Sequence, residues 1–237
     1  MMVQIEATDR WRETFPGGHV GVLLVGNVDN TASGAALDER KRAVESRLRH
    51  KYGDFSRADL LELPILQAYR DYYKQFDKTY HVQLQLESVV HKGKKLPAVS
   101  PLVDANFAAE LETLVLTAGH DAGLLVDPVT IDGTRGGESF TQLTGRVSTL
   151  KPDDMMMSDG GGIVCTILYG QDRRTAISRS TRRALYVAYA PAGVPLGAVQ
   201  QQLDAIRDNV RLFAPEVVTE RMEIFAANPP DASTVVR

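Results

Sequence analysis

The sequence predicts an α+β fold, in which a mixed and largely antiparallel sheet is flanked by helices. Three observations favour this class. Helical periodicity dominates up to about residue 120, short apolar segments separated by turn signals follow until residue 190, and an amphipathic helix returns near the C-terminus. Helices and strands that are segregated along a chain are typical of α+β proteins.

The composition is that of an ordinary globular protein. The 237 residues fit one large domain or two subdomains that share a core. A net charge of −3 excludes a uniformly basic nucleic-acid binder, although it allows a local basic patch. No apolar run approaches the roughly 20 residues that span a bilayer, and the N-terminus lacks the apolar core of a signal peptide. We therefore expect a cytoplasmic protein without a membrane partner.

The N-terminal part of the chain contains one expected strand and several expected helices. Residues 19–25 form a nearly continuous apolar run, which indicates a buried strand. Residues 37–51 indicate a charged helix. Ser56 is expected to cap a further helix, and Pro64 opens the next one. Residues 80–90 alternate as in a strand and also repeat as in a helix, so both interpretations stay open.

The segment from residue 100 to residue 120 predicts the helix around which the site is organised. Ser100 is expected to cap it, Pro101 suits its first position, and Gly119 supplies a left-handed stop just before His120. Helical spacing gives an apolar face made of Val103, Phe107, Leu111, Leu114 and Ala118. The polar stripe beside it consists of Asn106, Glu110, Thr113 and Thr117. This stripe lies either at the lip of a groove or on the solvated flank of an ordinary amphipathic helix.

The later part of the chain reads as strands followed by a helix. The expected strands are residues 124–131, 140–150, 155–157, 163–169 and 184–190. A turn is expected at 151–154 and a flexible hairpin at 159–162. Residues 195–213 repeat apolar side chains every three or four positions, which predicts an amphipathic helix, and the chain from Asn228 reads as a loose tail.

Several chemistries are disfavoured by what the sequence lacks. The glycine run at 160–162 is not followed by Lys-Ser/Thr and does not open a helix, so a hairpin is favoured over a phosphate loop. The five histidines show no metal-binding spacing, and a single cysteine forms neither an internal disulfide nor a cysteine-cluster metal site. Cys165 sits in an apolar strand and is expected to be core rather than a nucleophile. We expect no cofactor and no metal.

A basic segment stands out at residues 173–183. It holds five arginines among serines and threonines, and no acidic residue lies within it. Guanidinium groups beside hydroxyls suit phosphate binding, so the segment is either a solvated loop or an RNA contact. The arginines are Arg173, Arg174, Arg179, Arg182 and Arg183.

One family shares a series of short motifs with this chain. Residues 96–106 (LPAVSPLVDAN) resemble the Arg-Pro…Val-Val-Asp-Val-Thr-Asn segment of the bacterial phenylalanyl-tRNA synthetase beta subunit, in its central tRNA-editing module. Further similar segments are Gly119-His120, residues 142–153, 156–160 and 181–189. Together they cover about residues 15 to 213, and no catalytic synthetase motif accompanies them.

The resemblance implies a pocket between two halves of the module, where the family hydrolyses the ester of a mischarged tRNA. It places Asn106, His120, Thr166 and Gly170 at that pocket. His120 is the expected catalytic residue, which orients or deprotonates the attacking water, and Asn106 is expected to hold the amino acid or its carbonyl. We add Glu110, one helical turn from Asn106, as a candidate for the substrate's amino group.

The resemblance also shows departures that reshape the expected pocket. Val187 stands where the family has a glutamate that recognises a tyrosine hydroxyl, and residues 166–170 replace a Met-Gly-Gly segment. The expected function is that of a tRNA-binding protein that hydrolyses mischarged aminoacyl-tRNA in trans. The alternative is a non-catalytic binding module, or a sensor for an amino-acid-like small molecule.

The resemblance also divides the chain. Residues 1–14 are expected to be an N-terminal extension, and residues 214–237 a C-terminal tail. Between them, residues 15–213 form one domain of two interleaved halves, about 15–123 and 124–213.

Overall fold

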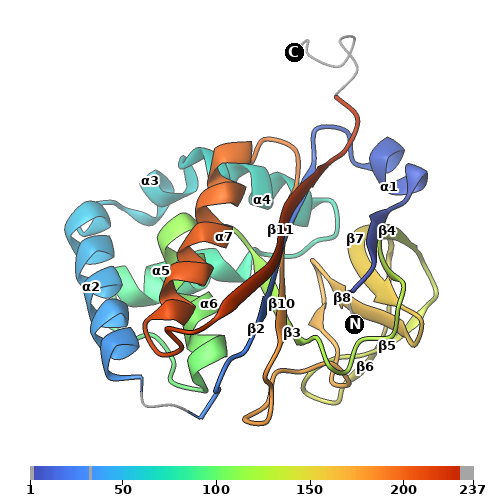
Figure 1. Ribbon diagram of the computed structural model, residues 1–237. Coiled ribbons are helices and arrows are strands. Elements are labelled where there is room, and N and C mark those ends of the chain that lie inside the picture. Colours follow the sequence, from blue (N-terminus) through green and yellow to red (C-terminus); the bar gives the residue numbers. More distant parts are fainter. Residues whose placement is uncertain (1–2, 32–33, 230–237) are drawn as a thin grey trace.

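The computed structural model describes residues 3–31 and 34–229 and places two sheets side by side (Figure 1). The first sheet has the strand order β11-β2-β10-β3, and the second has the order β1-β4-β7-β8-β9. A small hairpin of β5 and β6 accompanies the second sheet. The predicted α+β class, mixed and largely antiparallel with flanking helices, is confirmed.

The first sheet is entirely antiparallel and carries the helical layer. Its strands are β2 (His19–Gly26), β3 (Thr117–Asp121), β10 (Ala184–Ala190) and β11 (Val218–Ala226). Every residue of β10 is buried, because β10 lies between β2 and β3 and the second sheet packs toward it. This burial explains why β10 reads as a continuous apolar run.

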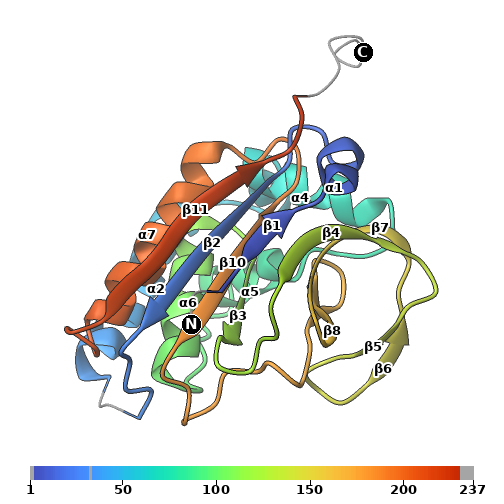
Figure 2. The same cartoon turned by 45° about the vertical axis from the view of Figure 1, so that its right-hand side comes forward.

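The helices gather on one side of the first sheet (Figures 1 and 2). They are α2 (Ala35–Tyr52), α3 (Arg57–Leu61), α4 (Pro64–Lys74), α5 (His81–Val90), α6 (Pro101–Thr113) and α7 (Leu196–Arg211). As predicted, Ser56 and Asp59 form a capping box at α3. The open choice at residues 80–90 is decided in favour of a helix, because Val82, Leu86 and Val89 bury one helical face. None of the described helices is long and apolar enough to cross a membrane.

The second sheet is built from segments that are far apart in the chain. Strand β1 (Ile5–Ala7) runs parallel to β4 (Val129–Arg135) and is followed by α1 (Asp9–Thr14). The remaining strands are β7 (Pro152–Asp159), β8 (Gly162–Thr166) and β9 (Gly170–Gln171), and the hairpin pairs β5 (Ser139–Thr141) with β6 (Val147–Thr149). The predicted turn at 151–154 is wrong, because β7 already begins at Pro152.

The central helix is shorter than predicted. It ends at Thr113, where Leu114 adopts the left-handed conformation at φ 63°, and residues 117–121 form β3 instead. Pairing of β3 with β10 therefore overrides the helical periodicity of this segment. Ser100 makes no side-chain cap; the first turn is capped by Asn30 Oδ1, which accepts a hydrogen bond from the Leu102 amide at 2.8 Å.

The segments expected to be an extension and a tail contribute strands to the two sheets where the structure describes them. Strand β1 pairs in the second sheet, and Trp11 of α1 is fully buried. Strand β11 pairs along β2, so residues 218–226 belong to the first sheet rather than to a tail. The expected loose tail from Asn228 lies mostly outside the described residues, and Asn228 itself hydrogen-bonds through its backbone to Arg12 and Gly17.

Candidate ligand pocket

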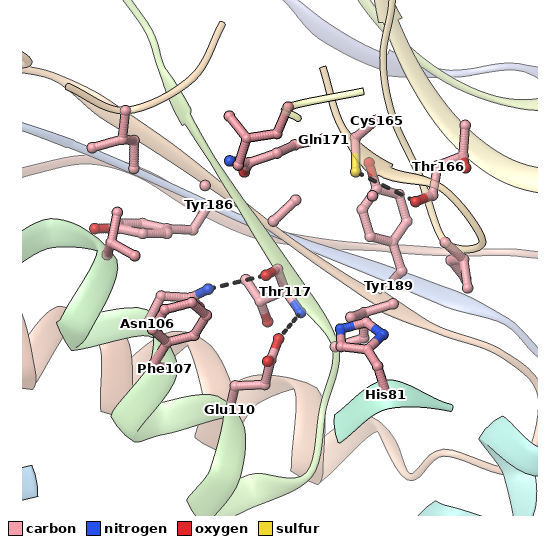
Figure 3. A pocket seen from close by; sticks show the side chains of 18 of the residues that line it. His81, Asn106, Phe107, Glu110, Thr117, Cys165, Thr166, Gln171, Tyr186 and Tyr189 are labelled. Carbon is pink, nitrogen blue, oxygen red and sulfur yellow. Dashed lines mark hydrogen bonds between the residues drawn. The ribbon is translucent and has the colours of Figure 1, made fainter. Parts of the chain in front are cut away.

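A cavity of about 510 Å³ opens between the first sheet with its helices and the second sheet. Helices α5 and α6 and strands β3 and β10 contribute one side, and β8, β9 and the β5–β6 hairpin contribute the other (Figure 3). Most of the lining is apolar, with a small number of polar side chains. This size and composition are typical of sites for small molecules.

The polar edge of α6 faces this cavity. Asn106 Nδ2 donates to the Thr117 carbonyl at 3.0 Å, and Glu110 accepts from the Thr117 amide at 2.8 Å (Figure 3). Both side chains are buried. Asn106 Oδ1 has no hydrogen-bond partner, although it is withdrawn from water. A buried unpaired acceptor in a pocket wall is a natural contact for a ligand donor.

Burial also sets the charge of Glu110. Desolvation raises the pKa of this carboxyl to about 8, and the hydrogen bond from the Thr117 amide only partly opposes that rise. The group is therefore mainly protonated at neutral pH. A bound cation would favour the carboxylate and make Glu110 a strong partner for an ammonium group.

A weakly partnered polar atom lies on the β10 wall. The Tyr189 hydroxyl is fully buried, and the side chain that interacts with it is the Cys165 thiol, a weak hydrogen-bonding group. Burial raises the pKa of Cys165, so this thiol stays protonated and carries little nucleophilic character. Cys165 is core, as predicted, and it also lines the cavity.

Among the histidines of the described residues, His81 is the one that lines the cavity, and it is the first residue of α5. Desolvation lowers its pKa, so the imidazole is neutral at pH 7. A neutral imidazole is able to accept a proton from a water molecule. The described residues hold no cluster of three or more histidine, cysteine or acidic side chains that would bind a metal ion.

A sequence model described as the B3/4 domain matches residues 67–218, which is more than half of the chain and contains every residue that lines the pocket. This chain belongs to the B3/4 domain family. The resemblance to the synthetase editing module seen in the sequence is thereby confirmed at the level of the family. A search of curated proteins finds no match.

Among solved structures, the chain is similar to an N-terminal fragment of the phenylalanyl-tRNA synthetase beta subunit from Pyrococcus horikoshii. The TM-score is 0.47 and the sequence identity 9%. The alignment covers 94% of this chain and 50% of the fragment, so this chain spans about half of the fragment's length.

Four of the predicted site residues line the B3/4 pocket together. Asn106 and Glu110 come from α6, Thr166 ends β8, and Gly170 begins β9. Val187 is buried in β10 and is not among the lining residues.

His120 is a correction to the prediction. It lies in β3 rather than beyond a helix end, and it is absent from the pocket lining. Its ring is fully buried, and Nδ1 lies 2.7 Å from the Thr175 hydroxyl. Burial lowers the pKa of His120 to about 4. Successive side chains of a strand point to opposite faces, so moving residues 117–121 from helix to strand turned this ring away from the cavity.

The basic segment at 173–183 is also less free than predicted. Arg174 forms ion pairs with Asp159 at 2.6 Å and Asp172 at 3.6 Å, and Arg183 pairs with Glu220 at 2.5 Å. Arg182 lies 3.8 Å from Asp29. These acidic partners all lie outside residues 173–183, so the sequence of the segment itself does not reveal the ion pairs. Within the described residues, Arg173 and Arg179 form no ion pair.

Three pocket residues were not predicted from the sequence: Tyr189, Gln171 and His81. Tyr189 belongs to an apolar strand whose pattern predicts core, and Gln171 follows a glycine in a loop-like segment. His81 carried no motif. Their convergence depends on how the two sheets meet, which the local sequence does not encode.

Proposed function

We propose that this B3/4 protein is a trans-acting hydrolase of mischarged aminoacyl-tRNA and that its pocket holds the aminoacyl group. The observation that carries the proposal is an apolar cavity whose wall holds a buried acceptor without a partner, Asn106 Oδ1, and a buried hydroxyl, Tyr189, beside which lies only the weakly bonding Cys165 thiol. Such a cavity suits a ligand with an apolar body and polar ends.

In this proposal, each end of an aminoacyl ester has its own partners in the pocket. Glu110 and Asn106 would receive the α-ammonium group, and its charge would draw the Glu110 proton off. The side chain would fill the apolar part of the cavity, with Tyr189 near its tip. The ester would then face the pocket entrance, because the nucleic acid attached to it remains outside the pocket.

Ester hydrolysis needs a positioned water and stabilisation of the oxyanion. We assign the role of accepting the water's proton to His81, because its neutral imidazole lines the cavity. His120 has no part in this proposal, since its ring lies outside the pocket.

The experiment is a panel of mischarged tRNAs incubated with micromolar protein, with released amino acid as the readout. At least one ester is expected to be cleaved. His81→Ala is expected to slow that release by about 10²-fold or more, and Asn106→Ala is expected to raise the KM. Glu39→Gln, an exposed position on α2, serves as the control and is expected to match the unmodified protein. If no amino acid were released from any mischarged tRNA in the panel, the proposal would be wrong.

A second candidate is a binding module for an amino-acid-like small molecule, without turnover. The ion pairs of Arg174 and Arg183 favour it, because they weaken the basic face that RNA would use. Thermal stabilisation by free amino acids, with unchanged melting on addition of tRNA, would support this candidate over the hydrolase.

A further inference from the structure

The loop between α5 and α6 carries a second basic cluster, the lysine loop, which consists of Lys92, Lys94 and Lys95. All three residues are exposed. We propose that the lysine loop binds the phosphodiester backbone of the RNA whose aminoacyl end enters the pocket. This inference rests on the proposed function for the identity of the RNA.

The backbone of the lysine loop is held in place by buried or half-buried side chains. Glu45 accepts a hydrogen bond from the Leu96 amide at 2.7 Å, and Lys41 donates to the Pro97 carbonyl at 2.6 Å. Arg49 donates to the Lys94 carbonyl at 3.1 Å. Because α2 fixes the loop at these points, ordering of its backbone adds little cost when a partner binds.

The three lysine charges, in contrast, are not neutralised. Among the described residues, none of them forms an ion pair, whereas Arg174 and Arg183 are both paired with carboxylates. Gly93, in the middle of the loop, has φ +63° and open space where a side chain would start, so the chain turns sharply there and leaves its surface uncovered. Free ammonium groups on a fixed turn suit phosphate contacts that position a nucleic acid without reading its sequence.

The lysine loop leads directly to the pocket. Lys95 is four residues before Val99, whose side chain lines the cavity and is 62% exposed. Four residues span at most about 14 Å. The same segment then continues into α6, which carries Asn106 and Glu110. Phosphate-binding and aminoacyl-binding groups therefore follow one another along a single stretch of chain.

The test compares two triple variants that each remove three positive charges. One replaces Lys92, Lys94 and Lys95 by alanine, and the other replaces Arg173, Arg179 and Arg182. Binding of each tRNA of the mischarged panel is measured at several salt concentrations. Hydrolysis of the aminoacyl-adenosine that carries the same amino acid, which has the ester but no phosphodiester backbone, is measured in parallel.

The lysine variant is expected to bind tRNA at least about tenfold more weakly at 0.1 M salt, with a shallower salt dependence. Its hydrolysis of aminoacyl-adenosine is expected to be unchanged. Unchanged tRNA binding by the lysine variant, or an equal loss with both substrates, would overturn the inference. If tRNA binding depends on the lysines but no substrate is cleaved by any form of the protein, the hydrolase proposal fails and the lysine loop stands.

Discussion

Tyr186 and Tyr189 are both fully buried in β10, yet their hydroxyls differ in one respect. The Tyr186 hydroxyl donates to the Leu102 carbonyl at 2.9 Å, whereas the Tyr189 hydroxyl faces the pocket and has only the Cys165 thiol beside it. A thiol is a weak hydrogen-bonding group, so the Tyr189 hydroxyl is available to a ligand.

This difference gives a paired prediction. Tyr186→Phe is expected to lower the free energy of unfolding by about 1 kcal/mol, because it removes the buried hydrogen bond to the Leu102 carbonyl. Tyr189→Phe is expected to leave the free energy of unfolding unchanged or raise it, and to weaken ligand binding about tenfold. Denaturant titration and a thermal-shift series with amino acids measure the two effects. A destabilised Tyr189→Phe protein would show that the hydroxyl is structural.

Glu110 predicts a dependence of stability on pH. Its folded-state pKa of about 8 lies above its ordinary value of 4.5, so its contribution is fully present below about pH 4.5 and is lost as pH rises through about 8. Glu110→Gln keeps an acceptor for the Thr117 amide and removes the titration. The variant is expected to melt several degrees higher than the unmodified protein at pH 9 and to differ little at pH 5.

The control for this pH series is Glu39→Gln, which changes the same charge at an exposed position. It is expected to shift the melting temperature equally, and only slightly, at both pH values. A Glu110→Gln protein that melts below the unmodified protein at pH 9 would contradict the raised pKa.

At the scale of elements, α6 depends on a residue outside itself. Asn30 accepts from the Leu102 amide in the first turn and donates to the Ser178 carbonyl at 2.7 Å. It is 1% exposed, so neither bond is replaced by water when the side chain is removed. Asn30 thereby fixes the start of the helix that carries Asn106 and Glu110.

Asn30→Ala is therefore expected to cost about 1–2 kcal/mol in the free energy of unfolding and to weaken ligand binding. Ser100→Ala is the matched control at the helix start, because the Ser100 hydroxyl makes no cap and only accepts a long 3.3 Å hydrogen bond from Asn30 Nδ2, and it is expected to cost less than about 0.5 kcal/mol. Chemical denaturation of the two variants decides the matter. A larger loss for Ser100→Ala would show that the hydroxyl is the cap in solution.

For the whole molecule, the sequence predicted elements well where periodicity was local and strong. The range of β10 was predicted without error, and the helices at α2, α4 and α7 were placed to within a few residues. Prediction failed where long-range pairing decided the outcome. Strand β3 lies in a helical pattern, and β1 and β11 lie in the segments expected to be an extension and a tail, but each has a partner strand distant in sequence.

Prediction of the candidate site likewise succeeded where the sequence signal was local and failed where long-range contacts decided the position of a residue. Asn106 was found through the family resemblance, and Glu110 was added because helical spacing sets it on the same edge. The helical pattern of residues 100–120 led to the wrong position for His120. Residues 117–121 form a strand instead, and in this strand the ring of His120 points away from the cavity. Thr166 and Gly170 were located through the family resemblance, whereas Tyr189 and His81 reach the cavity only through the meeting of distant elements.

Strand β11 also links the two ends of the chain. Arg221 donates to the carbonyls of Val3 and Ile5, so the last strand of the first sheet is tied to the first strand of the second (Figure 2). Strand β2 pairs with β10 and β11, and both of these strands are synthesised late because they lie near the C-terminal end of the sequence. The β10 wall of the pocket is therefore absent from a nascent chain until residues 184–190 have been synthesised, and the outer neighbour of β2 is complete only at residue 226.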